Sequence, residues 1–193
     1  TMTINKNPAI PGEVIQVKVT PKDGYYLASD GLQATCASAI LEPEFVKNED
    51  GAQTFTFEMP AGKVTLKANY IEEKSIEGNK LAVAFTSVNG YMGEYNSSEK
   101  VLTIDKAGLE TGVTVKMDGK AVAPWMLDFS SSKETVAVVS DTGKISTKQK
   151  GKAVITAALK KDDSKKISFT VTVKENVLIS DLTVKIRKPD YGT

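Results

Sequence analysis

The stretch from Phe129 to Ala157 constrains the fold more than any other part of the sequence. It contains three short strand-like runs separated by three turns: a serine-rich turn, Asp141-Thr142-Gly143 and Lys150-Gly151. Short apolar and polar runs bounded by glycine and serine are typical of antiparallel β-structure. No periodic pattern long enough for a helix of 10 residues occurs in the chain, so we predict an all-β protein.

These residues also resemble a known family, the bacterial Ig-like group 2 domain. Its pattern is an aromatic residue before Ser-Ser, a Val-Ala-x-Val strand, Gly-Lys-Ile, a glycine turn and an Ala-x-Ile-Thr-Ala strand. The chain carries these elements in order, with Phe129 where tryptophan is usual. The resemblance runs from about residue 100 to 175 and implies a two-sheet β-sandwich on a secreted or surface-attached bacterial protein. The inward phase of each strand predicts these core positions: Phe129, Val136, Val138, Ile145, Ile155, Val171 and Val173.

Residues 1–72 carry a second resemblance, to a divergent bacterial β-repeat related to the B-repeat of internalins. It rests on Gly24-Tyr25 and on the Phe57-Glu58-Met59-Pro60 corner with Ala61-Gly62. Because the loop after Met59 is short and contains glycine, we expect the strands at 54–59 and 64–70 to pair as a hairpin. The segment 38–52 departs from the repeat pattern, and there we expect a loop or a short helical turn.

The predicted organisation is an Ig-like β-sandwich preceded by a small β-repeat domain. Residues 1–73 form the repeat domain, 79–175 form the sandwich with an extra N-terminal hairpin, and 176–193 form an additional strand or the start of a following module. The charged segment 71–80, ending near Gly78-Asn79, is the expected linker. Asn89-Gly90 predicts a tight turn after Leu81–Val88. The sequence leaves open whether residues 79–98 belong to the sandwich.

The ends of the chain favour a fragment of a longer protein. The N-terminus lacks the charged and apolar regions of a signal peptide and begins in mid-strand. The run from Val177 to Ile186 has the pattern of one more strand.

Composition argues against catalysis. The chain has no histidine, which excludes Ser-His-Asp and Cys-His arrangements and histidine metal sites. The carboxylates sit at turns beside lysines, and the single cysteine, Cys36, shares a strand face with Leu32 and Ala34, as an inert core thiol would. We therefore predict no enzyme activity, no catalytic or metal-binding residues and no cofactor; a surface calcium at an acidic turn and a carboxylate-pair hydrolase are the alternatives.

Two groups of aromatic residues could make contacts beyond the core. Trp125, flanked by apolar residues, is expected to pack in a core or at its rim, the alternative being a carbohydrate-stacking platform. Tyr91 and Tyr95, with Met92, are expected to pack on a half-buried strand, the alternative being an interface. No ligand-binding residue is assigned.

The sequence supports two kinds of function. The first is a structural spacer among neighbouring modules of an extracellular, secreted or bacterial cell-surface protein. The second is cell adhesion through a host protein or glycan, with the accessory domain of a larger surface enzyme as a further alternative. The 25 basic and 24 acidic residues nearly cancel, so nucleic acid is not an expected partner. No apolar run spans a bilayer, and we expect a monomer.

Overall fold

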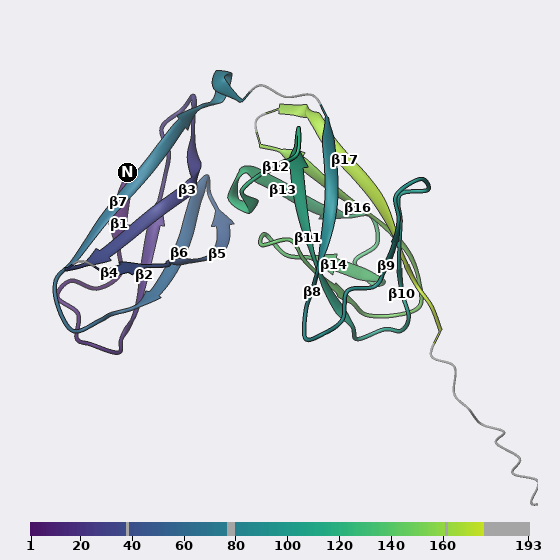
Figure 1. The fold of residues 1–193 in the computed structure, drawn as a ribbon, viewed down its shortest axis with the longest axis horizontal. Coiled ribbons are helices and arrows are strands. Elements are labelled where there is room, and N and C mark those ends of the chain that lie inside the picture. Colours follow the sequence, from purple (N-terminus) through teal and green to yellow (C-terminus); the bar gives the residue numbers. More distant parts are fainter. Residues whose placement is uncertain (38, 77–79, 161, 176–193) are drawn as a thin grey trace, which may run out of the picture.

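The computed structural model describes residues 1–37, 39–76, 80–160 and 162–175 (Figure 1). Strands dominate the described residues, and the helical segments there are two single 3₁₀ turns, η1 (Glu73–Ser75) and η2 (Pro124–Met126). The all-β prediction is confirmed. The strand expected at Val177–Ile186 lies outside the described residues.

The N-terminal half, residues 1–76, consists of two antiparallel sheets. The first has the order β1 (Met2–Ile4), β2 (Val14–Val19), β6 (Ala52–Glu58) and β5 (Glu44–Glu49); the second has the order β4 (Ala39–Leu41), β3 (Tyr25–Cys36) and β7 (Val64–Glu72). Strand β2 alternates as its sequence predicts, with Ile15, Val17 and Val19 buried. These residues pack on a core rich in phenylalanine.

The predicted hairpin between β6 and β7 is wrong. Strand β6 pairs with β2 on one side and with β5 on the other, so both of its edges are occupied. The corner from Met59 to Gly62 therefore crosses to the second sheet, where β7 pairs with β3. Gly62 has φ +138°, and a Cβ there would lie 3.0 Å from the Cys36 sulfur, so the crossing needs glycine.

The loop or helical turn predicted for 38–52 is also wrong, because β4 and β5 occupy most of this segment. Phe45 of β5 lies directly opposite Phe55 of β6, with ring centroids 5.6 Å apart. Asp50 and Gly51 have positive φ values of 51° and 74° and close the tight β5–β6 turn. The loop was expected because this segment departs from the repeat pattern, but burial of Phe45 against Phe55 stabilises a strand there.

The C-terminal half, residues 80–175, is a second sandwich. One sheet joins β8 (Leu81–Ser87), β11 (Glu110–Met117), β15 (Lys144–Thr147) and β14 (Ala137–Val139), with β12 (Lys120–Ala121) also on β11. The other has the order β13 (Leu127–Ser131), β16 (Gly151–Leu159), β17 (Asp162–Val173), β10 (Val101–Ile104) and β9 (Glu94–Asn96).

This strand order identifies an immunoglobulin-like arrangement. With β8, β11, β13, β14, β15, β16 and β17 taken as the seven main strands, the first, second, fifth and fourth form one sheet. The third, sixth and seventh form the other, as in the constant-type fold. Strand β10 adds to this second sheet by pairing parallel to β17. The expected Ig-like sandwich is therefore present in the C-terminal half.

Residues 81–98 belong to this sandwich and do not form an extra hairpin. Strand β8 pairs with β11 along seven residues, whereas β9 pairs with β10 in the opposite sheet. Between them, Val88 and Tyr91 exchange two backbone hydrogen bonds of 2.8 and 3.0 Å around Asn89-Gly90, which confirms the tight turn. The chain then crosses from one sheet to the other.

Most predicted core positions of the C-terminal half are correct. Val136, Ile145, Ile155, Val171 and Val173 are all at most 2% exposed. Val138 is only half-buried, because Ala137 takes the inward position on the three-residue edge strand β14. Phe129 is also half-buried: it points inward opposite Ala157, but β13 is an edge strand and leaves part of the ring uncovered.

Three predicted turn regions contain more regular structure than expected. Ser130 and Ser131 lie in β13, so the serine-rich turn begins after them. Asp162 and Asp163 lie in β17 and not at the tip of the turn before it. Strand β7 continues to Glu72 and η1 follows, so the start of the expected linker 71–80 is ordered.

Candidate functional site

The two halves meet at Trp125, the single tryptophan of the chain. It lies in η2 of the C-terminal half, where Pro124 occupies the first position of the turn, which suits proline because its missing N–H has no partner there anyway. The indole Nε1–H donates to the backbone oxygen of Leu27 at 3.0 Å. Its ring meets Phe45 and Phe55 edge-on, at centroid distances of 5.5 and 5.4 Å. Trp125 thus completes the aromatic core of the other half.

The N-terminal half is shaped to receive this ring. Strand β3 is irregular between Leu27 and Leu32, where its register against β7 shifts. Gly31 lies in this irregular stretch with φ +41°, and a Cβ there would lie 2.9 Å from Cζ2 of Trp125. Glycine supplies both the backbone conformation and the space that the close approach requires.

Further contacts surround the tryptophan. Tyr26 packs with Met117, Ala123, Met126 and Leu159 in a small cluster shared by the two halves. Asp141 accepts a hydrogen bond at 2.7 Å from the backbone N–H of Asn48. Lys165 donates to the backbone oxygen of Ile76 at 2.9 Å. We call this whole set of contacts, with Trp125 at its centre, the joint.

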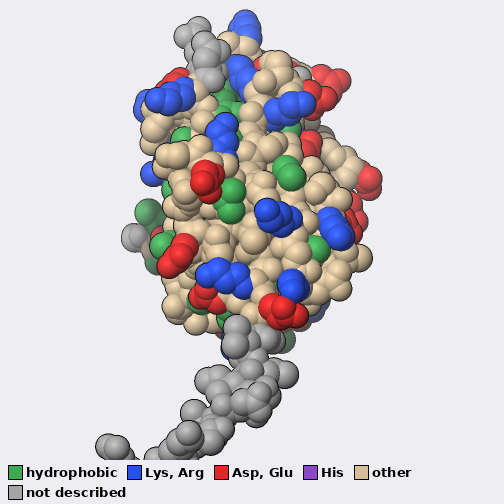
Figure 2. Space-filling model, turned by 90° about the vertical axis from the view of Figure 1, so that its right-hand side faces the viewer, with side chains coloured by type: hydrophobic (Ala, Val, Ile, Leu, Met, Phe, Trp, Pro, Cys, Tyr) green, Lys and Arg blue, Asp and Glu red, His purple; other side chains and the backbone are tan. Residues whose placement is uncertain are grey.

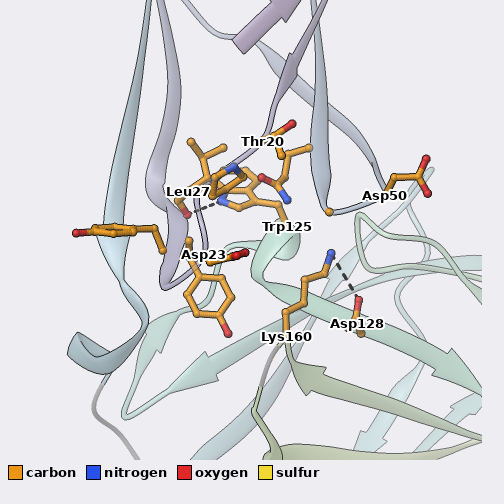
Figure 3. Close-up of a pocket in the computed structure, with 12 residues that line it drawn as sticks. Thr20, Asp23, Leu27, Asp50, Trp125, Asp128 and Lys160 are labelled. Carbon is orange, nitrogen blue, oxygen red and sulfur yellow. Dashed lines mark hydrogen bonds and ion pairs between the residues drawn. The ribbon is translucent and has the colours of Figure 1, made fainter. Parts of the chain in front are cut away.

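A cavity of about 490 Å³ opens at the joint and is lined from both halves (Figure 3). The N-terminal half contributes Thr20, Asp23, Asp50 and Gln53 together with Tyr25 and Tyr26, and the C-terminal half contributes Trp125, Asp128 and Lys160. Lys160 and Asp128 form an ion pair at 3.5 Å on one wall. We call this space the joint cleft.

A second cavity of about 400 Å³ adjoins the joint cleft and shares Tyr25 with it. Its other lining residues are Thr1, Lys22 and Tyr70. Tyr25 pairs with Glu72 and Leu27 pairs with Tyr70, so Tyr25 and Tyr70 are diagonal neighbours on one face of the β3–β7 ladder. The tyrosine hydroxyl of Tyr25 lies 3.3 Å from Oε1 of Glu72, to which it donates.

The electrostatics of the cleft suit binding better than proton transfer. Burial raises the pKa of Tyr26 to about 12, and the nearby carboxylates of Glu73, Asp162 and Asp128 add to the effect. Tyr26 is therefore neutral at physiological pH. Its pKa lies far from the range in which a general acid or base works efficiently. The lining offers hydrogen-bonding groups and aromatic rings, which bind and orient a ligand.

The other candidate residues of the sequence, Tyr91, Met92, Tyr95 and Cys36, do not line the joint cleft. Tyr91 and Tyr95 are half-buried against the C-terminal core, and Tyr95 contacts Phe85 at 4.6 Å between ring centroids. The phenol of Tyr91 accepts from the backbone N–H of Asp105 at 2.9 Å, and Met92 is 46% exposed. Cys36 is half-buried at the end of β3, in phase with Leu32 and Ala34.

The described residues contain no group of three or more Cys, Asp or Glu side chains arranged to hold a metal ion. No helix among them is both long and apolar enough to cross a membrane.

Sequence reasoning singled out Trp125 but not the residues around it. Packing was the predicted role of Trp125, yet nothing local indicated that its partners, Leu27, Phe45 and Phe55, lie 70 to 98 positions earlier in the chain. The pair Tyr25-Tyr26 could have indicated part of the site, because two adjacent tyrosines on a strand place an aromatic ring on each face of the sheet. Asp23, Gln53 and Lys160 had no distinguishing pattern.

The chain is distantly similar to solved structures of bacterial β-domains. No family model matches the sequence, and no curated protein matches it. A C-terminal 282-residue fragment of intimin, solved with the intimin-binding domain of the translocated intimin receptor, is 14% identical with a TM-score of 0.36. That match covers 83% of this chain, which spans 57% of the intimin fragment.

The fibronectin(III)-like modules of Clostridium thermocellum CbhA are 16% identical, with a TM-score of 0.27, over 98% of this chain and 100% of theirs. The immunoglobulin-like assignment rests on the strand order described above.

Proposed function

We propose that this chain is a non-catalytic, two-domain positioning module of a bacterial secreted or cell-surface protein, with its domains parting near residues 72–80. The C-terminal domain is proposed to be of the bacterial Ig-like group 2 kind, because the motif residues Val136, Ile145 and Ile155 form its core. The N-terminal domain is proposed to be a divergent relative of the internalin repeat, on the strength of its Met59–Gly62 corner.

The observation that carries this proposal is the packing of the Trp125 ring against Phe45 and Phe55 of the other half. Domains joined by a polar linker are expected to move relative to each other unless their interface is large and apolar. Here a large aromatic side chain crosses from one half into the core of the other, and Asp141 and Lys165 add hydrogen bonds on either side. Such a joint holds the two domains at one mutual angle, which is what a spacer requires.

The surface of the C-terminal half agrees with this role. Figure 2 shows the side of the molecule that the C-terminal half presents, with charges of both signs interspersed and hydrophobic side chains in small, separate spots. Large contiguous apolar patches mark protein-binding surfaces. The near balance of 25 basic and 24 acidic residues also gives no field that would draw the chain to nucleic acid.

The proposed partners are therefore the neighbouring modules of the same chain, with the molecule itself a monomer. Adhesion to a host protein or glycan is the second candidate function, and it is favoured by one observation: the exposed tyrosines beside the joint cleft. An accessory role beside a surface enzyme is equally compatible with a rigid positioning module.

Distance measurements between spin labels test the fixed joint. In a Cys36→Ser background, labels at Lys67 and Lys152, both exposed and one in each half, should give a single narrow distance distribution. Trp125→Ala should broaden the distribution, whereas Trp125→Phe, which keeps an aromatic ring at this position, should broaden it less. A broad distribution in the protein that retains Trp125 would overturn the proposal.

A further inference from the structure

We propose that the joint cleft, together with the adjoining cavity at Tyr70, binds a neutral oligosaccharide. Sugar rings would stack on Tyr25 and Tyr70 and exchange hydrogen bonds with the polar side chains of the joint cleft. This goes beyond the positioning role, because a rigid spacer needs no ligand site. Clefts between domains, lined by aromatic residues and a few polar groups, are where small-molecule sites most often form.

The stacking surface comes from the two tyrosines. Tyr25 is 38% exposed and Tyr70 is 43% exposed, so each presents ring surface to solvent, in contrast to the half-buried Tyr91 and Tyr95. Diagonal neighbours on adjacent antiparallel strands lie roughly 7–8 Å apart, with their Cβ atoms somewhat closer, which is within reach of aromatic side chains. A tyrosine has an apolar body and a polar tip, which matches the apolar faces and hydroxyl edges of a sugar ring.

The polar contacts come from the joint cleft, which Tyr25 also lines. Asp23 and Asp50 are exposed carboxylates at the edge of the joint cleft and can accept hydrogen bonds from hydroxyl groups. Across the joint, the paired Lys160 and Asp128 offer donors and acceptors held in place by their 3.5 Å contact. Gln53 adds an amide side chain that is 5% exposed and contributes to the lining.

The charges indicate a neutral ligand. Three aspartates, Asp23, Asp50 and Asp128, and two lysines, Lys22 and Lys160, line the two cavities that share Tyr25. A site for a polyanion would need an excess of cations, and a site for a cationic peptide would need a stronger excess of carboxylates. Hydroxyl groups, which both donate and accept, satisfy such a mixed lining without leaving a buried charge unpaired.

The site is also preorganised. Trp125 forms one wall, and its ring is held by the bond to Leu27 and by two phenylalanine rings. The Tyr25 ring is held by the bond to Glu72. Side chains already ordered before binding lose less entropy when a ligand arrives. A ligand in the joint cleft would touch both halves and would thus stabilise the joint.

Trp125 provides a direct readout, since the only tryptophan of the chain lines the joint cleft. The intact chain should be titrated with cellohexaose, xylohexaose, maltohexaose and chitohexaose, following its fluorescence emission and, in parallel, the heat released. We expect saturable binding of at least one of these sugars. Tyr70→Ala should weaken that binding at least tenfold. Tyr70→Phe, which keeps the ring, and Ile40→Ala, an exposed residue that does not line the joint cleft, should leave it nearly unchanged.

Three outcomes would overturn the site: no saturable binding of any of the four sugars, equal binding by the folded Tyr70→Ala variant, or binding of an oligo-arginine peptide in place of the sugars. Circular dichroism establishes that each variant is folded. The spin-label distances are measured without ligand, so failure of the sugar site and failure of the fixed joint are distinguishable.

Discussion

The two halves of the molecule are both antiparallel sandwiches, but they complete their cores in different ways. The C-terminal half encloses a mainly aliphatic core around Phe169, with Leu102, Ile104, Ile145, Ile155 and Val171 all fully buried between its own sheets. The N-terminal half has a smaller second sheet and a core built around Phe45 and Phe55, and one of the rings packed on them is Trp125 of its neighbour. The main core of the C-terminal half is enclosed by its own sheets, whereas the main core of the N-terminal half is completed at the joint.

The path of the chain differs as well. In the N-terminal half, Thr1 and Tyr70 line the same cavity, so the chain enters and leaves this half at the same end. In the C-terminal half, β8 starts near the joint and β17 runs away from it (Figure 1). The chain therefore enters and leaves the C-terminal half at opposite ends, whereas it enters and leaves the N-terminal half at the end that lies at the joint.

Removing the shared tryptophan should have the largest effect. Trp125→Ala is expected to lower the free energy of unfolding by about 3–5 kcal/mol, the usual cost of truncating a large aromatic residue in a core. Hydrogen exchange should show the loss mainly in β2, β5 and β6. Trp125→Phe should cost less. Equal loss of protection in β16 and β17 would show that the C-terminal half depends on the joint too.

Truncating a phenylalanine within the C-terminal half should cost more on a central strand of its sheet than on an edge strand. Phe169 is 2% exposed on the central strand β17, and Phe169→Ala should cost about 3–5 kcal/mol. Phe129→Ala, on the edge strand β13, should cost clearly less because part of its ring is already in water. Urea denaturation of the two variants compares them. A larger cost at Phe129 would contradict the half-buried position described here.

Substituting the glycine that admits the tryptophan should act on the N-terminal half alone. Gly31→Ala places a Cβ 2.9 Å from Cζ2 of Trp125, and a non-glycine residue at positive φ costs a further ~1–3 kcal/mol. The double variant with Trp125→Ala should show less than additive loss, because the clash is then absent. Additive losses in thermal denaturation would mean that backbone strain is the whole effect.

Breaking the hydrogen bond beside the tryptophan should have a smaller effect. Asp141→Ala leaves the part-buried N–H of Asn48 without its acceptor, at a cost of about 1–3 kcal/mol. Asp141→Asn retains an acceptor oxygen and serves as the control. Hydrogen exchange at the Asn48 amide is the direct measurement; exchange unchanged in Asp141→Ala would show that this contact does not hold in solution.

The smallest effect should appear only at high pH. Because the pKa of Tyr26 is raised from 10.0 to about 12 in the folded protein, the folded state holds its proton more tightly than the unfolded state does. Stability is then unaffected below about pH 10 and falls as the pH rises toward 12. Tyr26→Phe should reduce this alkaline loss, measured by urea denaturation across the range, whereas Tyr25→Phe at the exposed neighbour should not. An identical alkaline loss in Tyr26→Phe would contradict the assignment.

Local pattern was enough to predict individual strands and tight turns. The alternation in Val14–Val19 and the positive φ required at Asn89-Gly90 are properties of a few adjacent residues, and both appear as expected. Local pattern failed at Phe45. Its segment was predicted to be a loop, and it forms a strand because the Phe45 ring packs on Phe55 of the neighbouring strand. The joint cleft as a whole could not be predicted from the sequence, because its lining comes from four separate segments of both halves, 20–27, 50–53, 125–128 and Lys160.

The sequence by itself determined that this protein is built of β-strands, where several of them lie, and which face of those strands is apolar. These features depend on side-chain periodicity and on turn residues, which act over a few positions. Only the tertiary structure decided which strands pair and what covers each core. The five residues between β6 and β7 could close a hairpin or cross between sheets, and only the occupation of both edges of β6 selects the crossing. Likewise, the sequence predicted that Trp125 packs in a core or at its rim. Only the tertiary structure shows that it packs in the space beside Phe45, Phe55 and Gly31 of the other half.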